Sequence, residues 1–552
     1  MSAQAFAPEK AGKFHVLQPE TTYTGSPITP LQKGLPKLTQ SLCPECSGLI
    51  GARLFEEDGK VIMEKTCAEH GYFRDIVFSD VKLYLKMEQW TFGDNRGIAN
   101  PSVRDAVTCP ESCGLCNLHT SHTGLANIDL TNRCNLTCPV CFANANVQGY
   151  LYEPELAHIG RMLQALRNTK PVAGRIVQFS GGEPTLHPRF FDILRMAKEQ
   201  GFSHIQIATN GLTFESLEFA QQAKEAGLHT LYLQFDGVTD EVYRRTRGER
   251  LWERKLRVIE NVRRAGLKIV FVPTIVKGVN DHEIGDIIRV ALENIECTSG
   301  ISFQPVAFTG RIARHELEAK RFTLSDFAHA VYDQTGLCDP YRDWFPLACV
   351  TPFSKLLGAI RGDETTTLSC HPHCSLGTYM FVDEQRNAVP VTRFVDIGAM
   401  MQDMDNLARR AGKAWVKLFS KVRAWNSLRR HFHEELAPEG LTFERFLQTL
   451  QGMVDKKYGR GQGDGTFTYK TLMIAGMHFM DHYNYDVERV KRCVIHYSAP
   501  NGQLYPFCAY NSGPTFRERI EKQFSSSLPE GMRVSALNGN GHQNGANGCG
   551  NC

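Results

Sequence analysis

The 552-residue sequence has little net charge and no long apolar run. Its 62 Lys and Arg residues nearly balance 59 Asp and Glu residues, so charge gives no argument for a nucleic-acid partner. The longest apolar stretch, near Leu267–Val276, is too short for a membrane span and is expected to be a buried strand. The first thirty residues lack the apolar segment of a signal peptide. We therefore expect a cytoplasmic protein with more than one domain.

Cysteine, in contrast, is abundant. The chain has 18 cysteines, many at Cys-x2-Cys and Cys-x3-Cys spacings, and in a reducing compartment such spacings indicate metal binding instead of disulfides. The main group is Cys134, Cys138 and Cys141, which follows an apolar stretch typical of a strand. Three thiolates on one loop can hold three corners of a four-iron cluster and leave the fourth iron open. A zinc site would need a fourth ligand nearby, and the loop from Asn132 to Asn146 supplies none.

Short β-rich runs alternate with amphipathic helical stretches around this triplet. The expected strands are Asn127–Leu130, Arg175–Ser180, His204–Ala208, Leu231–Phe235, Lys268–Thr274 and Ile301–Val306. The expected helices are Ala157–Asn168, Phe190–Gln200, Thr213–Ala226 and Leu251–Ala265. This alternation predicts an α/β fold with a parallel sheet, in which ligands bind at the carboxyl ends of the strands. Such ends carry Gly181-Gly182-Glu183-Pro184, Thr209-Asn210 and Asp236.

A cysteine triplet of this spacing, followed one helix later by Gly-Gly-Glu-Pro, resembles the radical S-adenosylmethionine (SAM) enzymes over roughly Asn127 to Gln334. The resemblance implies a partial (βα)6 TIM-like barrel and a catalytic 4Fe–4S cluster on Cys134, Cys138 and Cys141. It also implies SAM contacts at Gly181, Gly182, Glu183 and Pro184, and further contacts at Thr209, Asn210 and Asp236. These last three are equally common as turn-forming residues.

The chemistry that the resemblance implies is reductive cleavage of SAM. One electron from the reduced cluster breaks a carbon–sulfur bond, and the 5′-deoxyadenosyl radical that results abstracts hydrogen from an unactivated carbon. A reductant such as ferredoxin or flavodoxin would supply the electron. A non-catalytic iron–sulfur electron-transfer protein is the alternative, but it has no use for Gly-Gly-Glu-Pro beside an open-site triplet.

More metal is expected outside the barrel. The spacing of Cys109, Cys113 and Cys116 repeats that of the main triplet, which indicates an auxiliary cluster. Two fully ligated four-iron clusters need eight cysteines, and the chain offers Cys109, Cys113, Cys116, Cys349, Cys370, Cys374, Cys493 and Cys508. Some of these are alternatively buried free thiols, as we expect for Cys297 and Cys338.

Near the N-terminus, two knuckles about twenty residues apart carry Cys43, Cys46, Cys67 and His70. They resemble a rubredoxin or zinc-ribbon hairpin that holds one mononuclear iron or zinc, a site with a role in folding.

The order of these motifs resembles, over residues 40 to 512, a family that includes the archaeal tetraether lipid synthase and class D radical SAM methyltransferases acting on a pterin. We expect a lipid chain as substrate, joined through a new carbon–carbon bond. The reason is a predicted basic amphipathic helix over Asn406–Phe432, where Trp415 and Trp425 lie opposite a row of cations and suit a peripheral membrane contact. Packing of that helix on the barrel is the alternative, and a small pterin-like heterocycle is the alternative substrate.

These motifs predict five regions. They are an N-terminal region with the Cys/His knuckle (1–95), an auxiliary-cluster segment (96–126), the radical SAM core barrel (127–335), a C-terminal auxiliary-cluster and helical domain (336–515), and a disordered Gly- and Asn-rich tail (516–552) that ends with Cys549 and Cys552.

Overall fold

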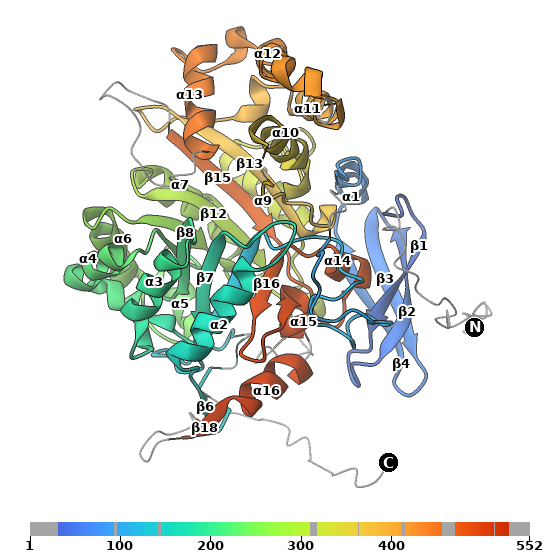
Figure 1. Cartoon of the computed structure of the whole chain (residues 1–552), viewed down its shortest axis with the longest axis vertical. Coiled ribbons are helices and arrows are strands. Elements are labelled where there is room, and N and C mark those ends of the chain that lie inside the picture. Colours follow the sequence, from blue (N-terminus) through green and yellow to red (C-terminus); the bar gives the residue numbers. More distant parts are fainter. Residues whose placement is uncertain are drawn as a thin grey trace, which may run out of the picture.

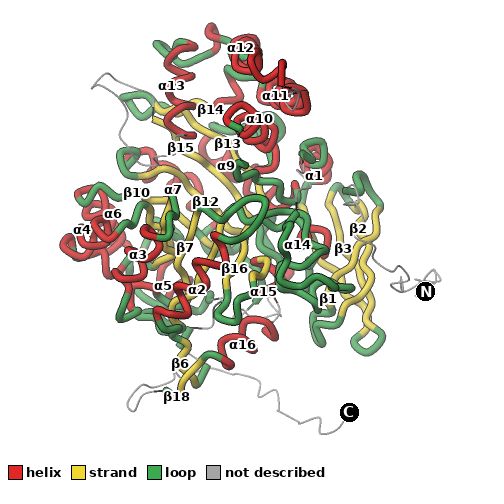
Figure 2. The backbone as a smooth tube through the Cα atoms, viewed as in Figure 1, coloured by secondary structure: helices red, strands yellow, loops and turns green. Residues whose placement is uncertain are grey.

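One large mixed sheet runs through the computed structural model, and a small four-stranded sheet lies beside it (Figures 1 and 2). The structure describes residues 31–92, 97–141, 143, 145–146, 148–309, 317–362, 364–410, 414–454, 470–512 and 514–528. Cys549 and Cys552 therefore lie outside the described residues.

Six parallel strands in chain order form the centre of the large sheet. They are β5 (Leu125–Thr131), β7 (Ile176–Gly181), β8 (His204–Thr209), β9 (Thr230–Gln234), β10 (Lys268–Val272) and β12 (Thr298–Pro305). The helices that follow them are α2 (Leu156–Arg167), α3 (Phe190–Glu199), α4 (Leu217–Ala226), α5 (Asp240–Arg247), α6 (Trp252–Arg264), α7 (Ile284–Glu293) and α9 (Leu324–Thr335). The predicted α/β fold is thus confirmed, and each of the six predicted strands is present.

The sheet continues past both of its expected edges. Beyond β12 come β15 (Lys470–Met477), β13 (Ser375–Val382) and β14 (Ala388–Pro390), and beyond β5 come β16 (Ile495–Ser498) and β17 (Leu504–Pro506). A short strand, β11 (Thr274–Ile275), also pairs with β12. Among the described strands no pairing closes the sheet into a barrel. The C-terminal segment therefore adds strands to both edges of the predicted core.

The two faces of the central strands differ in polarity, because alternate residues of a strand point to opposite sides. One face carries Ile128, Phe179, Ile207 and similar side chains, which are fully buried in the main core with residues of the helices. The other, which we call the polar face, carries Asn127, Asp129, Gln178, Ser180, Gln206, Tyr232, Gln234, Ser302 and Gln304.

The small sheet is an antiparallel meander at the N-terminal end. Its strands are β1 (Lys37–Leu42), β2 (Leu49–Glu57), β3 (Lys60–Cys67) and β4 (Gly71–Phe78), and α1 (Val81–Met87) follows. Buried Arg321 binds Asp75 of β4 and also Asp481, which follows β15, at 2.7 Å. This ion-pair network ties the small sheet to the large one.

The remaining elements belong to the C-terminal half, apart from β6 (Tyr150–Tyr152). They are α8 (Leu317–Lys320), α10 (Thr351–Arg361), α11 (Ile397–Arg410), α12 (Ala414–Arg430), α13 (Phe443–Val454), α14 (Val487–Lys491), α15 (Phe507–Ser512), α16 (Pro514–Gln523) and β18 (Ser525–Ser527). The start predicted for the disordered tail, residue 516, is too early, because α16 reaches Gln523 and β18 pairs with β6.

The helix predicted over Asn406–Phe432 is divided between α11 and α12. Ala424 and Leu428 of α12 pack against the apolar cluster around Phe394 and Phe432, and the Trp425 ring meets Phe443 edge-on at 5.6 Å. Helix packing thus accounts for part of this apolar face, while Val422 (58%) and Trp425 (48%) stay exposed. Lys413 and the side chains of Trp415 and Lys417 lie outside the described residues. No described helix is both long and apolar enough to cross a bilayer.

Candidate active site and metal sites

The loop that carries Cys134, Cys138 and Cys141 leaves the carboxyl end of β5. Asn146 holds the start of this loop, since its side chain accepts a hydrogen bond from the Cys134 amide (2.9 Å) and donates one to the Cys134 carbonyl (2.8 Å). Burial raises the pKa of the Cys134 thiol, and Glu183, Cys138 and Cys141 raise it further. The three thiols interact within one partly buried loop, a donor set that fits the three-cysteine cluster.

Gly181 and Gly182 let the end of β7 lie directly on the chain that enters this loop. Gly181 has φ +126°, and a Cβ atom there would stand 2.3 Å from the Thr131 carbonyl oxygen. A Cβ atom at Gly182 would stand 2.2 Å from the Arg133 oxygen. In this contact the amides of Gly182 and Glu183 donate to the Thr131 and Arg133 oxygens, both at 2.7 Å. Only glycine permits so close an approach.

Glu183 is fully buried, and four donors surround its carboxylate. These are the Thr185 amide and hydroxyl, the Thr209 hydroxyl at 2.8 Å and the Asn210 amide at 2.8 Å. Burial nevertheless raises the pKa of Glu183. The predicted SAM contacts Glu183 and Thr209 thus join the ends of β7 and β8 to each other. Pro184 begins the short helix η1 (Pro184–Leu186) that follows.

Asn210, in contrast, faces the cysteine loop. Its side-chain amide donates to Asn135 Oδ1 at 2.6 Å and lies 3.9 Å from Cys134 Sγ. Its backbone oxygen accepts from Lys255 Nζ at 2.6 Å. Lys255 is fully buried, also donates to the Gln234 backbone oxygen (2.7 Å), and has a pKa that burial lowers to about 7.

Asp236 is enclosed by protein donors. The Arg247 guanidinium binds both of its carboxylate oxygens, and the Thr274 amide and Thr246 hydroxyl donate to it as well. Asp236 is 0% exposed. In this structure its carboxylate therefore binds Arg247 and the Thr274 amide of β11 and does not face an open site. The sequence pattern does not single out Arg247 and Lys255, because both stand among many Arg and Lys residues between 244 and 264.

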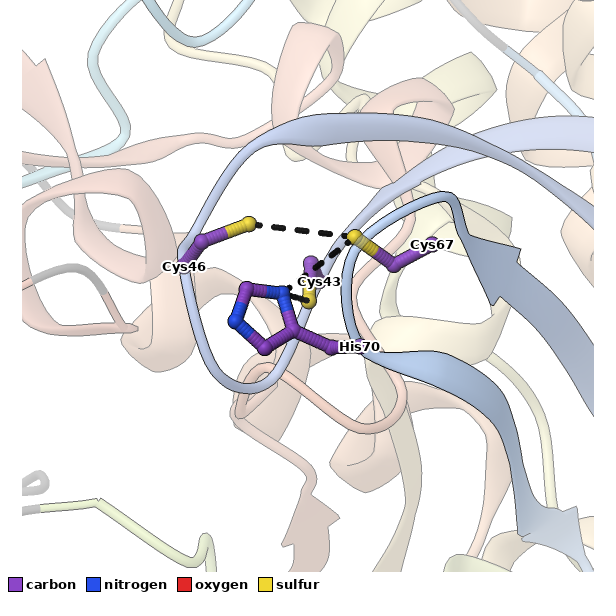
Figure 3. A group of neighbouring side chains, drawn as sticks. All are labelled: Cys43, Cys46, Cys67 and His70. Carbon is purple, nitrogen blue, oxygen red and sulfur yellow. Dashed lines mark hydrogen bonds between the residues drawn. The ribbon is translucent and has the colours of Figure 1, made fainter.

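The predicted N-terminal metal site is assembled (Figure 3). The ligand atoms of Cys43, Cys46, Cys67 and His70 all lie within 4.8 Å of one another. Cys67 Sγ is 3.5 Å from His70 Nδ1 and 4.0 Å from Cys46 Sγ, and the edges of a zinc tetrahedron with such ligands are about 3.5–3.8 Å. The hydrogen bond from His70 lowers the pKa of Cys67 to about 6, which favours the thiolate that a metal needs. The four residues fit one tetrahedral ion.

Four of the predicted auxiliary cysteines share one apolar cluster with Tyr485. Cys109 and Cys508 are buried in this cluster, and Cys113 and Cys493 pack against it; burial and these four thiols raise the pKa of Tyr485. Cys370 interacts with Cys374 and Cys493, and Cys116 with Cys109 and Cys113. Cys349 lies in the short helix η5 (Leu347–Val350), which contacts the segment that carries Cys374.

Two buried polar atoms in this region are unpaired. Within the described residues, Tyr485 Oη and Nδ2 of the preceding Asn484 have no hydrogen-bond partner although both residues are 0% exposed, and Tyr485 packs with Cys109 and Cys508. Such atoms normally have partners, and the sulfur atoms of a cluster would accept hydrogen bonds from them. The donor set therefore fits auxiliary iron–sulfur clusters. Cys297 and Cys338 are instead packed in the main core.

Comparison with known proteins agrees with this arrangement. Residues 128–291 match the radical SAM superfamily, and residues 35–79 match the "HMPTM N-terminal zinc ribbon domain". The "7,8-dihydro-6-hydroxymethylpterin dimethyltransferase" of Methanocaldococcus jannaschii is 41% identical over 507 residues, which cover 91% of this chain and 98% of that relative. A "GTP 3',8-cyclase" of Microcystis aeruginosa is 27% identical over 32% of this chain and 56% of that protein. Streptococcus suis SuiB bound to S-adenosylmethionine aligns at 18% identity with a TM-score of 0.30, covering 38% of this chain and 46% of that chain.

Two expectations change as a result. The long full-length match is to a methyltransferase, so the expected lipid-joining activity is not supported. The chain is an enzyme that uses SAM, so the non-catalytic electron-transfer alternative is set aside. The chain belongs to the radical SAM superfamily and, within it, to the family of the Methanocaldococcus jannaschii relative.

Proposed function

We propose that this protein is a radical SAM methyltransferase whose substrate is a pterin-like heterocycle. The observation that carries the proposal is the 41% identity to the Methanocaldococcus jannaschii dimethyltransferase over 98% of its length. The proposal replaces the lipid chain that the sequence analysis favoured.

The polar face of the sheet supports a heterocycle. Tyr232 Oη donates to Ser302 Oγ at 2.7 Å and accepts from Gln304 Nε2 at 3.0 Å. On the same face Gln206 donates to Gln178 (2.6 Å), and Gln178 donates to Asn127 (2.9 Å). A lipid tail laid on the partly exposed Tyr232, Gln234 and Gln304 would remove water from them without replacing its hydrogen bonds, which is costly. The ring nitrogens, amino and oxo groups of a pterin would pair with them.

This face is partly exposed on two of its strands, β9 and β12. β9 and β12 lie in the interior of the sheet, yet Tyr232, Gln234 and Gln304 are partly exposed while their neighbours Leu231, Leu233 and Phe303 are fully buried. The exposure is thus confined to the polar face. It lies beside the strand ends that carry Asn210 and the cysteine loop, where a substrate would meet SAM.

We propose that Cys134, Cys138 and Cys141 hold the catalytic 4Fe–4S cluster, with Gly181, Gly182 and Asn210 lining the SAM site. When bound, the cluster and SAM supply one-electron reductive chemistry. We further propose two auxiliary 4Fe–4S clusters on Cys109, Cys113, Cys116, Cys349, Cys370, Cys374, Cys493 and Cys508, and zinc at the N-terminal site. Buried Glu183 and Lys255 hold the strand ends in place around these groups.

The test is a product assay. Anaerobically reconstituted protein is incubated with a strong reductant, SAM that carries a deuterated methyl group, and 7,8-dihydro-6-hydroxymethylpterin, and the products are analysed by mass spectrometry. We expect a pterin that has gained one or two labelled carbon units, and no product from a lipid offered in parallel. A protein that forms 5′-deoxyadenosine but leaves the pterin unchanged would contradict the proposed substrate. The Cys134→Ala variant is the control for cluster-independent product.

A further inference from the structure

We propose that Arg247 is a positioning residue for the catalytic cluster. Asp236 holds its guanidinium so that the remaining N–H groups bind the Cys138 sulfur and the Val140 carbonyl. Through these bonds Arg247 anchors the cysteine loop and makes the cluster easier to reduce. The inference rests on the proposed assignment of the cluster to Cys134, Cys138 and Cys141, but it does not depend on which substrate is methylated.

The guanidinium is held from several sides. Arg247 Nη2 is 2.9 Å from Asp236 Oδ1, and Nε binds Oδ2 of the same carboxylate. Nη2 also lies 3.3 Å from Thr274 Oγ1. Asp236 is in turn fixed by the Thr274 amide at 2.9 Å and the Thr246 hydroxyl at 3.3 Å. A planar group bound along one edge in this way points its free edge in one direction only.

That free edge points at the cysteine loop. Nη1 donates to the Val140 carbonyl oxygen at 3.1 Å, between Cys138 and Cys141. The positive charge of the guanidinium also opposes the rise that burial causes in the pKa of Cys138, so the two groups interact, and we propose that the second N–H of Nη1 donates to the Cys138 sulfur. Lysine could not make these contacts together with the paired contact to Asp236, because its three N–H groups radiate from a single nitrogen.

The local sequence sets this arrangement apart from an ordinary surface ion pair. Arg247 is the last residue of α5. Gly248, with φ +83°, ends this helix beside the cysteine loop. Arg247 is 9% exposed, whereas Arg244, one turn earlier, is exposed and pairs with Glu241. Burying a charged pair is costly. If Arg247 served only to pair with Asp236, the Nη1 side of its guanidinium would have no use.

The consequence for the cluster follows from its charge. Reduction adds one negative charge to a cluster that thiolates already make anionic. A cationic donor at one of its sulfurs therefore stabilises the reduced state more than the oxidised state, and hydrogen bonds to sulfur are among the factors that set such potentials. Loss of the Arg247 contacts should lower the reduction potential and loosen the loop.

The experiment compares Arg247→Lys with Arg244→Lys in the full-length, reconstituted protein without substrate. An EPR-monitored redox titration measures the potential of the SAM-binding cluster, and release of iron to a chelator measures how firmly the loop holds it. For Arg247→Lys we expect the ratio of reduced to oxidised cluster at the wild-type midpoint to fall about tenfold, which for a one-electron couple is a shift of about 59 mV, and iron to be released faster. Arg244→Lys should match the wild type. An unchanged potential together with unchanged iron release in Arg247→Lys overturns the proposal.

Two further measurements keep the test decisive if Arg247→Lys folds poorly. The double variant Asp236→Asn/Arg247→Gln removes both charges at similar volume and should show the same lowered potential. In the wild type, arginine labelled with ¹⁵N in its guanidinium should give a weak nitrogen coupling to the reduced cluster by pulsed EPR. No such coupling would refute the contact with Cys138, whatever the variants do. Failure of the pterin assay would leave all of these readouts unaffected.

Discussion

Replacing Gly182 by alanine should disable the candidate active site without changing any cysteine. The new Cβ atom would stand 2.2 Å from the Arg133 carbonyl oxygen, and Cβ atoms essentially never approach another atom closer than 3.0 Å. The end of β7 must therefore move away from the start of the cysteine loop. The obstacle is a backbone carbonyl, so a side-chain rotation cannot relieve the contact.

The expected losses of stability and of rate follow from the contacts that are broken when the end of β7 moves away from the cysteine loop. Two backbone hydrogen bonds of 2.7 Å cross this contact, and each contributes about 1 kcal/mol to stability. A displacement of about 1 Å in a reacting geometry costs on the order of 100-fold in rate. We therefore expect Gly182→Ala to fold with modestly reduced stability and to cleave SAM about 100-fold more slowly.

The assay is anaerobic formation of 5′-deoxyadenosine, read beside iron content and thermal unfolding. Gly51→Ala is the matched control, because a Cβ atom there meets nothing within 4 Å. If Gly182→Ala cleaved SAM at the wild-type rate, the close packing of β7 on the loop would have no part in catalysis and the reasoning would be wrong.

Three further predictions follow from the metal sites and the polar face. Replacing Cys134, Cys138 and Cys141 together by alanine should abolish SAM cleavage while EPR signals of the auxiliary clusters persist; 5′-deoxyadenosine at the wild-type rate would refute the assignment. Mössbauer and metal analysis of reconstituted protein should show well over one four-iron cluster per chain and one zinc that His70→Ala loses; only about four irons would remove the auxiliary clusters from the proposal. Gln304→Leu leaves the Tyr232 hydroxyl without its donor at 3.0 Å and should raise KM for the pterin about tenfold, with uncoupled SAM cleavage unchanged; an unchanged KM would exclude this part of the polar face from substrate binding.

Most of the features that could be predicted, the central strands and the N-terminal metal site, depend on residues that are close together in the sequence. The six central strands follow from local alternation of apolar residues, and the four ligands of the N-terminal site follow from two short knuckles joined by one hairpin. Both are decided within a few tens of residues. The chain-order arrangement of the strands then follows from right-handed crossovers.

The sequence placed Glu183, Thr209 and Asp236 at strand ends, and the resemblance predicted SAM contacts there, but neither indicated the protein partners that these side chains have. Glu183 and Thr209 bind each other across two strands, and Asp236 binds an arginine that the sequence does not distinguish from its neighbours. Whether a polar side chain at a strand end meets a ligand or another side chain depends on packing between elements, which local pattern does not record.

The sequence by itself therefore determined the chemistry that this protein carries: its cysteine groups, its glycine-rich turn and its strand order. Only the tertiary structure decided which groups share a site. Cys493 interacts with Cys370 although β15 and β16 extend opposite edges of one sheet, and the segment between these strands also binds Ser47 and Lys65 of the N-terminal region through His482. The physical reason is that long-range pairing of strands depends on the burial of whole faces, a property of the assembled sheet instead of any single segment.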